Sequence, residues 1–180
     1  MTKIIKPNTM EEYKIITYTA LHLIKSENAI IKRICVNKKI QREYLINAFK
    51  KNGIKSDIYD KIKIKTKEED ILASLQFKTG RTQKVIVIEA KGGSVFYNFY
   101  TMLGQFICMK KSRSTFYWFA FALPSSWEVK IKNALLDNGK MNPLISDIIK
   151  NYTKNGQGLW FYFIDEDYSV KKFNWKEFLK

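Results

Sequence analysis

Hydrophobic residues in the N-terminal third of the chain recur every three or four positions, which is the spacing of helices. In the first of these segments, Ile16, Ala20 and Leu23 form one apolar stripe behind Thr9. The last segment stops at Asn52-Gly53 with lysines in its final turn, a usual helix end. The three predicted helices cover residues 13–25, 28–36 and 40–51.

From Lys61 onward the spacing changes to that of strands. Ile62 and Ile64 alternate with lysines, as in a strand that is exposed on one side. A strand that opens at Asp70 follows, and a short turn near Arg81 joins it to a strongly apolar strand, Lys84 to Ile88. The latter is apolar on both faces, which is typical of an internal strand between two layers.

The rest of the chain predicts further helices and strands. Ser94 is a helix N-cap candidate, and a mostly apolar helix extends from it to about Lys111. On that helix Ser94, Asn98, Thr101 and Gln105 form one polar stripe. Beyond it we expect a buried strand (115–123), two helices (127–136 and 143–152) and a hairpin (158–164 with 170–173) turned at Asp165-Glu166-Asp167.

Length and composition favour one folded domain. The 180 residues are 46% hydrophobic and 14% aromatic, and no linker, repeat or low-complexity segment divides them. We therefore expect a single α/β domain over residues 1–180. It would comprise a helical N-terminal part (1–57), a core of sheet and helix (58–124) and C-terminal helices with closing strands (125–180).

Three ionisable residues mark the two central strands. Asp70 opens one strand, and Glu89 and Lys91 end the other. Two strands joined by a tight loop lie antiparallel, so a turn centred near Arg81 places Asp70 opposite Gly92. Glu89 and Lys91 point the same way, about 6.6 Å apart along the strand. We expect the three side chains to share one pocket.

Such a pocket suits a hard divalent cation. The carboxylates of Asp70 and Glu89 and the main-chain carbonyl of Ala90 are oxygen ligands of the kind that Mg²⁺ or Mn²⁺ prefers. Lys91 is then placed to orient or deprotonate a water, or to stabilise charge on phosphate oxygens. Metal-dependent phosphodiester hydrolysis is the chemistry that this set predicts.

This arrangement resembles the PD-(D/E)xK nuclease superfamily, with Asp70 as its aspartate and Glu89-Ala90-Lys91 as its ExK tripeptide. Glu69 stands where the family often has proline. The resemblance implies a three-layer restriction-endonuclease-like core (αβββαβ), a central mixed sheet flanked by helices, here with extra N-terminal helices and a C-terminal hairpin. It also implies that Asp70 and Glu89 hold the metal and that Lys91 serves the water.

Two further site residues follow from the same resemblance. Gln105 matches a glutamine that often supports the metal or the water, whereas Met109 stands where some branches have a tyrosine. Glu12 is the candidate for the glutamate that the family's first helix often lends to the metal. Each has a local alternative. Thr9-x-x-Glu12 is also a capping box, and the Gln105 amide is also satisfied by neighbouring backbone.

The tripeptide itself admits a structural interpretation, because a D…ExK pattern arises by chance in lysine-rich chains. Glu89 and Lys91 are then the exposed end of a strand, and Asp70 is a boundary residue.

The formal net charge of +15 favours a polyanionic partner, yet 28 of the 32 basic residues are lysine, as in chains from AT-rich genomes. A cluster around the third helix, either a DNA-gripping face or a solvated surface, comprises Lys38, Lys39, Arg42, Lys50, Lys51 and Lys55.

Several classes of protein are disfavoured. Cys35 and Cys108 have no zinc-finger spacing, and the only histidine, His22, excludes histidine-based nucleases. There is no P-loop or HExxH motif, and neither a signal segment nor a membrane-length apolar run is present. We therefore expect a protein of the cytoplasm, without membrane contact or small-molecule cofactor.

The sequence thus favours a Mg²⁺-dependent DNA endonuclease, either of restriction type or encoded by a mobile element or virus. A homodimer is one expectation, since cutting both strands of a duplex usually takes two sites. A Holliday-junction resolvase of the same superfamily is the nearest alternative. A catalytically inactive nucleic-acid-binding module and a lysine-rich interaction protein are alternatives of other classes.

Overall fold

The computed structural model describes residues 10–64, 69–76, 83–92, 101–105, 107–108, 117–137, 140–143, 147 and 159–180. Residues 101–105 and 107–108 are helical. The other elements are α1 (Glu12–Ser26), β1 (Ile30–Val36), α2 (Lys39–Lys51), the 3₁₀ helix η1 (Ser56–Lys61), β2 (Ile62–Ile64), β3 (Ile71–Gln76), β4 (Gln83–Ala90), β5 (Tyr117–Pro124), the 3₁₀ helix η2 (Ser125–Trp127), α4 (Glu128–Leu135), β6 (Leu136–Asp137), β7 (Lys140–Met141), β8 (Leu159–Ile164), β9 (Val170–Asn174) and α6 (Trp175–Phe178).

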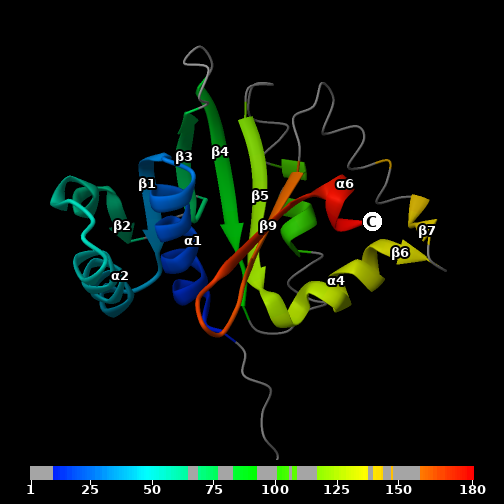
Figure 1. Ribbon diagram of the computed structural model, residues 1–180, viewed down its shortest axis with the longest axis horizontal. Coiled ribbons are helices and arrows are strands. Elements are labelled where there is room, and N and C mark those ends of the chain that lie inside the picture. The colour runs from blue at the N-terminus through cyan, green and yellow to red at the C-terminus, as the bar shows by residue number, and fades with distance from the viewer. Residues whose placement is uncertain are drawn as a thin grey trace, which may run out of the picture.

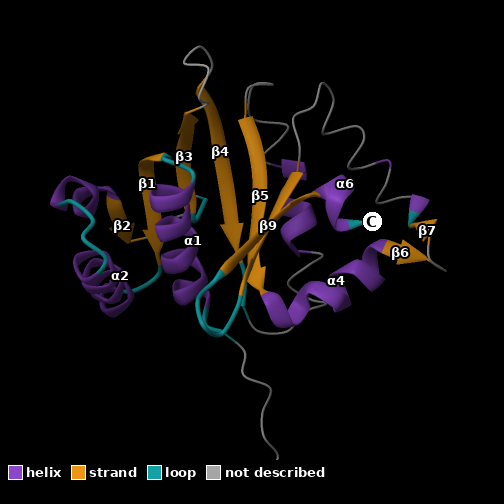
Figure 2. Cartoon of the chain, in the orientation of Figure 1, coloured by secondary structure: helices purple, strands orange, loops and turns teal. Residues whose placement is uncertain are grey.

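A mixed sheet of seven strands organises these elements (Figures 1 and 2). Its order is β2-β1-β3-β4-β5-β8-β9. Strand β3 runs antiparallel to both β1 and β4, whereas β5 and β8 continue parallel to β4. The carboxyl ends of β1, β2, β4, β5 and β8 therefore lie at one edge of the sheet, together with the start of β3.

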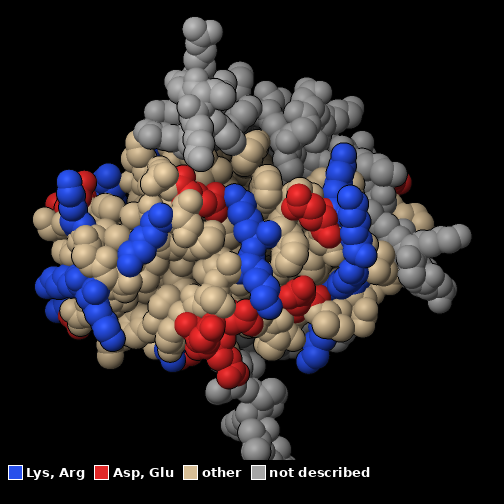
Figure 3. Space-filling view, viewed as in Figure 1, with Lys and Arg blue, Asp and Glu red and all other residues tan. Residues whose placement is uncertain are grey.

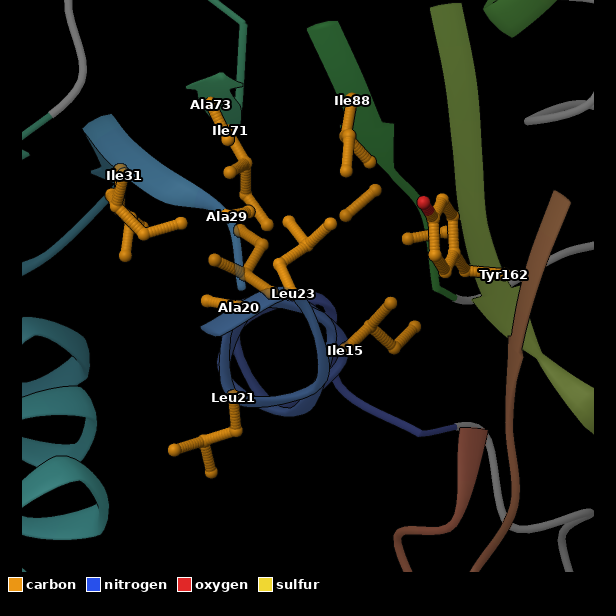
Figure 4. Close-up of a cluster of buried hydrophobic side chains, with 14 of the residues drawn as sticks. Ile15, Ala20, Leu21, Leu23, Ala29, Ile31, Ile71, Ala73, Ile88 and Tyr162 are labelled. Carbon is orange, nitrogen blue, oxygen red and sulfur yellow. The ribbon is translucent and has the colours of Figure 1, made fainter. Parts of the chain in front are cut away.

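Hydrophobic cores cover both faces of the sheet. On one face α1 packs over the central strands, and Figure 4 shows Leu23 of α1 directed toward Ile71 and Ile88. On the other face the helical residues Met102 and Leu103, together with α4 and α6, pack against β4, β5 and β8. The predicted α/β class, with a mixed sheet between helices, is confirmed.

One predicted helix is wrong. Residues 30–36 form β1, which lies between β2 and β3 in the sheet, although their apolar spacing favoured a helix. The segment IIKRICV is rich in β-branched residues, which lose side-chain freedom in a helix and pack well on a pleated surface. Its buried positions are Ile31, Ile34, Cys35 and Val36, and the second and third of these follow Ile31 by three and four residues. Tertiary packing therefore overrode a chance helical period.

The first strand of the three-stranded meander is also not the predicted one. Ile62–Ile64 was expected to precede β3 in the meander, but it forms β2 at the sheet's edge, parallel to β1. The partner of β3 is β1, with Ile34 opposite Ile71. The order helix, three antiparallel strands, helix, strand is thus built from α1, β1, β3, β4, the helical residues 101–105 and 107–108, and β5, with α2, η1 and β2 inserted.

Most other predicted elements are confirmed within a few residues. They are the helices α1, α2 and α4, the strands β3, β4 and β5, and the hairpin of β8 and β9. Ser94, Asn98, Met109 and most of the helix expected at 143–152 lie outside the described residues. In the part of the chain that the structure describes, no helix has the length and apolarity needed to cross a membrane.

Candidate active site

The edge of the sheet where β4 ends is the place that collects the predicted site residues. The arrowheads of β4 and β5 in Figure 1 point to this edge, and α1 begins beside it. β3 starts there because it runs antiparallel to β4. In open α/β sheets, ligands bind outside the carboxyl ends of the strands.

The register of β3 and β4 differs from the predicted one by three residues. Ile71 pairs with Ile88, so the next step of the ladder brings Asp70 opposite Glu89 rather than Gly92. The last pair is Gln76 with Gln83, and the residues between them lie outside the described part. The prediction erred because it centred the turn near Arg81. The observed register brings the two carboxylates closer together than expected.

The Asp70 side chain makes a hydrogen bond to the β4 backbone just beyond the Ile71–Ile88 pair of the β3–β4 ladder. Its carboxylate is 1% exposed, and Oδ2 accepts a hydrogen bond from the N–H of Ala90 at 2.7 Å. In a strand the N–H and C=O of one residue point to the same side. The carbonyl of Ala90 is therefore directed toward Asp70 as well, as a third ligand would be.

Glu89 and Lys91 form a close ion pair. Lys91 Nζ donates to Glu89 Oε1 at 2.6 Å, and the Glu89 side chain is only 4% exposed. Glu89 alternates with Ile88 and Ala90, which face α1, so it shares the opposite face with Val87. Burial of this charge is costly, and the adjacent lysine compensates for it. The alternative of an exposed strand end is wrong for Glu89.

Glu12 lies at the site and is not part of a capping box. Helix α1 begins at Glu12 with Glu11 as N-cap, and the Glu11 side chain makes no capping hydrogen bond. A box headed by Thr9, which lies outside the described residues, would instead need Glu12 at the third helical position. Instead, Glu12 Oε2 lies 3.8 Å from Lys91 Nζ. Its Oε1 accepts a hydrogen bond from Asn37 Nδ2 at 3.5 Å. Glu12 and Lys91, which are far apart in the sequence, are therefore neighbours in the folded protein.

Gly92 is a site residue that the sequence analysis read only as part of a turn. A Cβ added there would lie 2.3 Å from the carbonyl oxygen of Met10 and 3.2 Å from the N of Glu12. Only glycine lets the end of β4 approach the start of α1 so closely. The position therefore brings Glu12 within reach of Lys91.

Arg33 and Glu69 form a second, partly buried ion pair that the sequence analysis missed. Arg33 donates from its guanidinium to Glu69 Oε1 at 2.8 Å, and Glu69 is 3% exposed. Glu69 immediately precedes Asp70, while the N–H of Cys35 donates to the Asp70 carbonyl at 2.8 Å. These contacts fix the backbone from which Asp70 projects. No sequence signal revealed the pair, because residues 28–36 had been predicted as a helix.

Gln105 lies on the face of the sheet that also carries Glu89. It belongs to the helical residues 101–105, and the neighbouring Met102 and Leu103 pack into the same core as Val87. Its Oε1 is buried and has no hydrogen-bond partner in the described part of the chain. The predicted hydrogen bond between neighbouring backbone and this amide is therefore not made by Oε1 among the described residues.

The donor set suits a hard cation. Across the described ranges, no group of three or more His, Cys, Asp or Glu side chains could hold a metal ion. Mg²⁺, however, usually takes one or two carboxylates and keeps several waters. Asp70 and Glu89 supply two carboxylates, and the completely buried Ala90, which follows Glu89, donates its N–H to Asp70. The residues present therefore fit this ion.

Two other polar groups lie apart from this site. His22 Nε2 lies 3.4 Å from Glu27 Oε1 at the far end of α1, as a packed helix residue. The acidic trio Asp165-Glu166-Asp167 turns the β8–β9 hairpin, as expected. A hydrogen bond with Ser125 and the nearby Lys171 lower the pKa of Asp165.

Comparison of the chain with protein-family models, with curated protein sequences and with solved structures yields no match. The functional assignment consequently depends on the residues and geometry described above.

Proposed function

We propose that this protein is a metal-dependent DNA endonuclease that hydrolyses phosphodiester bonds at the end of β4. The observation that carries the proposal is the convergence of Asp70 and the Glu89–Lys91 pair at one strand end. Burying an ion costs on the order of several kcal/mol, so two buried carboxylates lower the stability of the fold. A purely structural role would not require them here. These charges lie at the carboxyl end of β4, the edge at which open α/β sheets bind ligands.

The arrangement of elements supports the same proposal. The antiparallel strands β1, β3 and β4, followed by a helical segment and the parallel strand β5, match the αβββαβ order expected of a restriction-endonuclease-like core. In that order the aspartate opens the second strand and the ExK tripeptide ends the third. Asp70 precedes β3, and Glu89 and Ala90 end β4.

Each residue has a distinct task in the proposed reaction. Asp70, Glu89 and the Ala90 carbonyl would hold Mg²⁺, or Mn²⁺ in its place, and this ion would supply Lewis-acid stabilisation of the phosphate and an acidified water. Lys91 lies between Glu89 and Glu12, where its ammonium group can donate to a water or a phosphate oxygen. Gln105 offers a buried acceptor that can orient a water.

A cleavage assay tests the proposal. The protein is incubated with supercoiled, linear, single-stranded and four-way-junction DNA, with Mg²⁺, Mn²⁺ or EDTA. We expect cleavage that EDTA abolishes and that falls at least about 100-fold in Asp70→Ala, Glu89→Ala and Lys91→Ala. Preference for the junction would indicate the resolvase alternative, whereas metal-independent or absent cleavage contradicts the nuclease proposal.

Matched variants separate chemistry from folding. Asp70→Asn keeps an oxygen that accepts from the Ala90 N–H, and Glu89→Gln removes charge at nearly constant volume. Gln105→Ala should lower the rate less than these changes do. Lys130→Ala, on the exposed face of α4, is the control. Full activity in any Asp70, Glu89 or Lys91 variant would refute the site.

A further inference from the structure

The sheet edge that carries the candidate site is electrostatically uneven. A cleft of about 840 Å³ lies on its β5–β8 side, and carboxylates from α1, α4 and the hairpin line it. In Figure 3, acidic side chains gather at the lower edge, below α1 and the hairpin. The acidic lining residues are Glu11, Glu128, Asp165, Glu166 and Asp167. Lys14 and Lys171 also line the cleft, but they pair with Glu11 and Asp165, so the lining keeps a net negative charge that repels a polyanion.

The opposite side of the same edge is basic. Lys38 and Lys39 occupy the connection from β1 to α2, and Lys63 of β2 pairs with Cys35 near the end of β1. All three lysines are exposed. No ion pair with a carboxylate engages them within the described ranges. Their charges are therefore available to a partner.

The basic connection is close to the site. β1 and β4 are separated by β3 alone, so their ends lie about 10 Å apart at the usual strand spacing. Phosphates of one DNA strand follow one another every 3.4 Å or so along the helix axis. A strand cut at Glu89 would thus present phosphates a few nucleotides away to Lys38 and Lys39.

Hydrogen bonds hold this connection in one conformation and join it to the site. Gln41 Oε1 accepts from the N–H of Asn37 at 3.0 Å and of Lys38 at 3.1 Å. Asn37 in turn donates to Glu12, which lies 3.8 Å from Lys91 Nζ. An ordered contact of this kind positions a substrate without a large entropic cost.

From these observations we infer that Lys38, Lys39 and Lys63 bind the phosphate backbone of duplex DNA beside the cleaved bond. The inference rests on the nuclease function proposed above. By contrast, Lys50 and Lys51 end α2 about 18 Å away, at 1.5 Å per residue. The six-residue basic cluster of the sequence therefore divides into two groups, and only one adjoins the site.

The test compares two triple variants of equal charge. One is Lys38→Ala with Lys39→Ala and Lys63→Ala; the control is Lys50→Ala with Lys51→Ala and Lys55→Ala, all exposed lysines. Binding of a fluorescent duplex is measured in EDTA over a salt series. We expect the first variant to bind about 10- to 100-fold more weakly at 0.1 M salt, with the slope of log K against log salt reduced by up to about 2.7. The control should change both far less.

Each outcome has a defined meaning. Equal losses in both variants, or no DNA binding by the unaltered protein, would overturn the proposed surface. Cleavage by the unaltered protein with equal KM in the two variants would reject the surface while leaving the nuclease function standing. Selective loss of binding without any cleavage would retain the surface and reject the nuclease function.

Discussion

Single residues at the end of β4 carry charges that the fold buries at considerable cost. Asp70 and Glu89 are both almost completely enclosed, and one lysine and one backbone N–H are the contacts identified for them. Natural proteins retain such arrangements mainly at functional sites, because apolar residues of similar volume are usually more stabilising. The stability that is lost by burying Asp70 and Glu89 is the reason for which we propose a catalytic role for them.

Gly92 provides a prediction at the residue scale. Gly92→Ala should destabilise the protein by about 1–3 kcal/mol, because the new Cβ meets the Met10 backbone and one of the two segments must move. The shift should also lower metal-dependent cleavage, since Glu12 follows the same backbone. Urea unfolding and plasmid cleavage measure the two effects.

Gly104 is the matched control for that experiment. It is exposed in a helical segment, and a Cβ there meets nothing within 4 Å. Gly104→Ala should be neutral or stabilising by up to about 1 kcal/mol. Equal unfolding midpoints for the two alanine variants would show that the close approach at Gly92 is unimportant.

At the scale of elements, the β8–β9 hairpin is fastened to α1 by aromatic side chains. Tyr168 at the hairpin turn stacks on Tyr18 of α1, with ring centroids 3.8 Å apart and planes 10° from parallel. The Tyr18 hydroxyl lies 3.3 Å from that of Tyr44 in α2. Burial and the Tyr44 hydroxyl raise the pKa of Tyr18, so the Tyr18 hydroxyl stays protonated. The stack holds the hairpin over the acidic cleft.

The backbone of Tyr168 makes the stack testable. Its φ of 69° lies in the left-handed region, which costs an L-residue about 1–2 kcal/mol. Tyr168→Ala should lose about 0.5–1.5 kcal/mol of aromatic stacking in addition to buried area, whereas Tyr168→Phe should retain most of it. Tyr168→Gly should be no less stable than the alanine variant, contrary to the usual order. Thermal unfolding of the three variants decides, and a glycine variant clearly below alanine would contradict the account.

At the scale of the whole molecule, Glu27 links the end of α1 to the last strand of the sheet. Lys172 of β9 donates to its Oε2 at 2.5 Å, and His22 lies beside Oε1. Burial alone would raise the pKa of Glu27, but the neighbouring His22 and the hydrogen bond from Lys172 outweigh burial and lower it. A carboxylate with a lowered pKa in the folded state stabilises the fold above its ordinary pKa of 4.5.

The corresponding prediction concerns stability against pH. Glu27→Gln should lower the free energy of unfolding at pH 7 by about 1–3 kcal/mol. The difference from the unaltered protein should shrink as the pH falls below 4.5 and through the lowered pKa, because Glu27 is then protonated in both folded and unfolded chains. Urea unfolding at pH 7 and pH 3.5 or so measures it. A difference that is constant over this range would exclude the ionic role.

The sequence by itself determined the local features of this protein. Alternation and helical spacing predicted α1, α2, β4 and the C-terminal hairpin, since these depend on near neighbours and on one buried face. The residue types and positions of Asp70, Glu89 and Lys91 identified the candidate chemistry, because these too can be read from short segments of the sequence. β1 was misread because its apolar residues fitted both periods, and only pairing with β3 selects the strand.

Tertiary structure alone decided which residues meet. The register that places Asp70 opposite Glu89 depends on a turn whose length no short motif specifies. Contacts of Glu12 with Lys91, and of Arg33 with Glu69, join segments 36 or more residues apart. Such contacts follow from the packing of whole elements, whereas local spacing reports only which side of its own element a residue occupies.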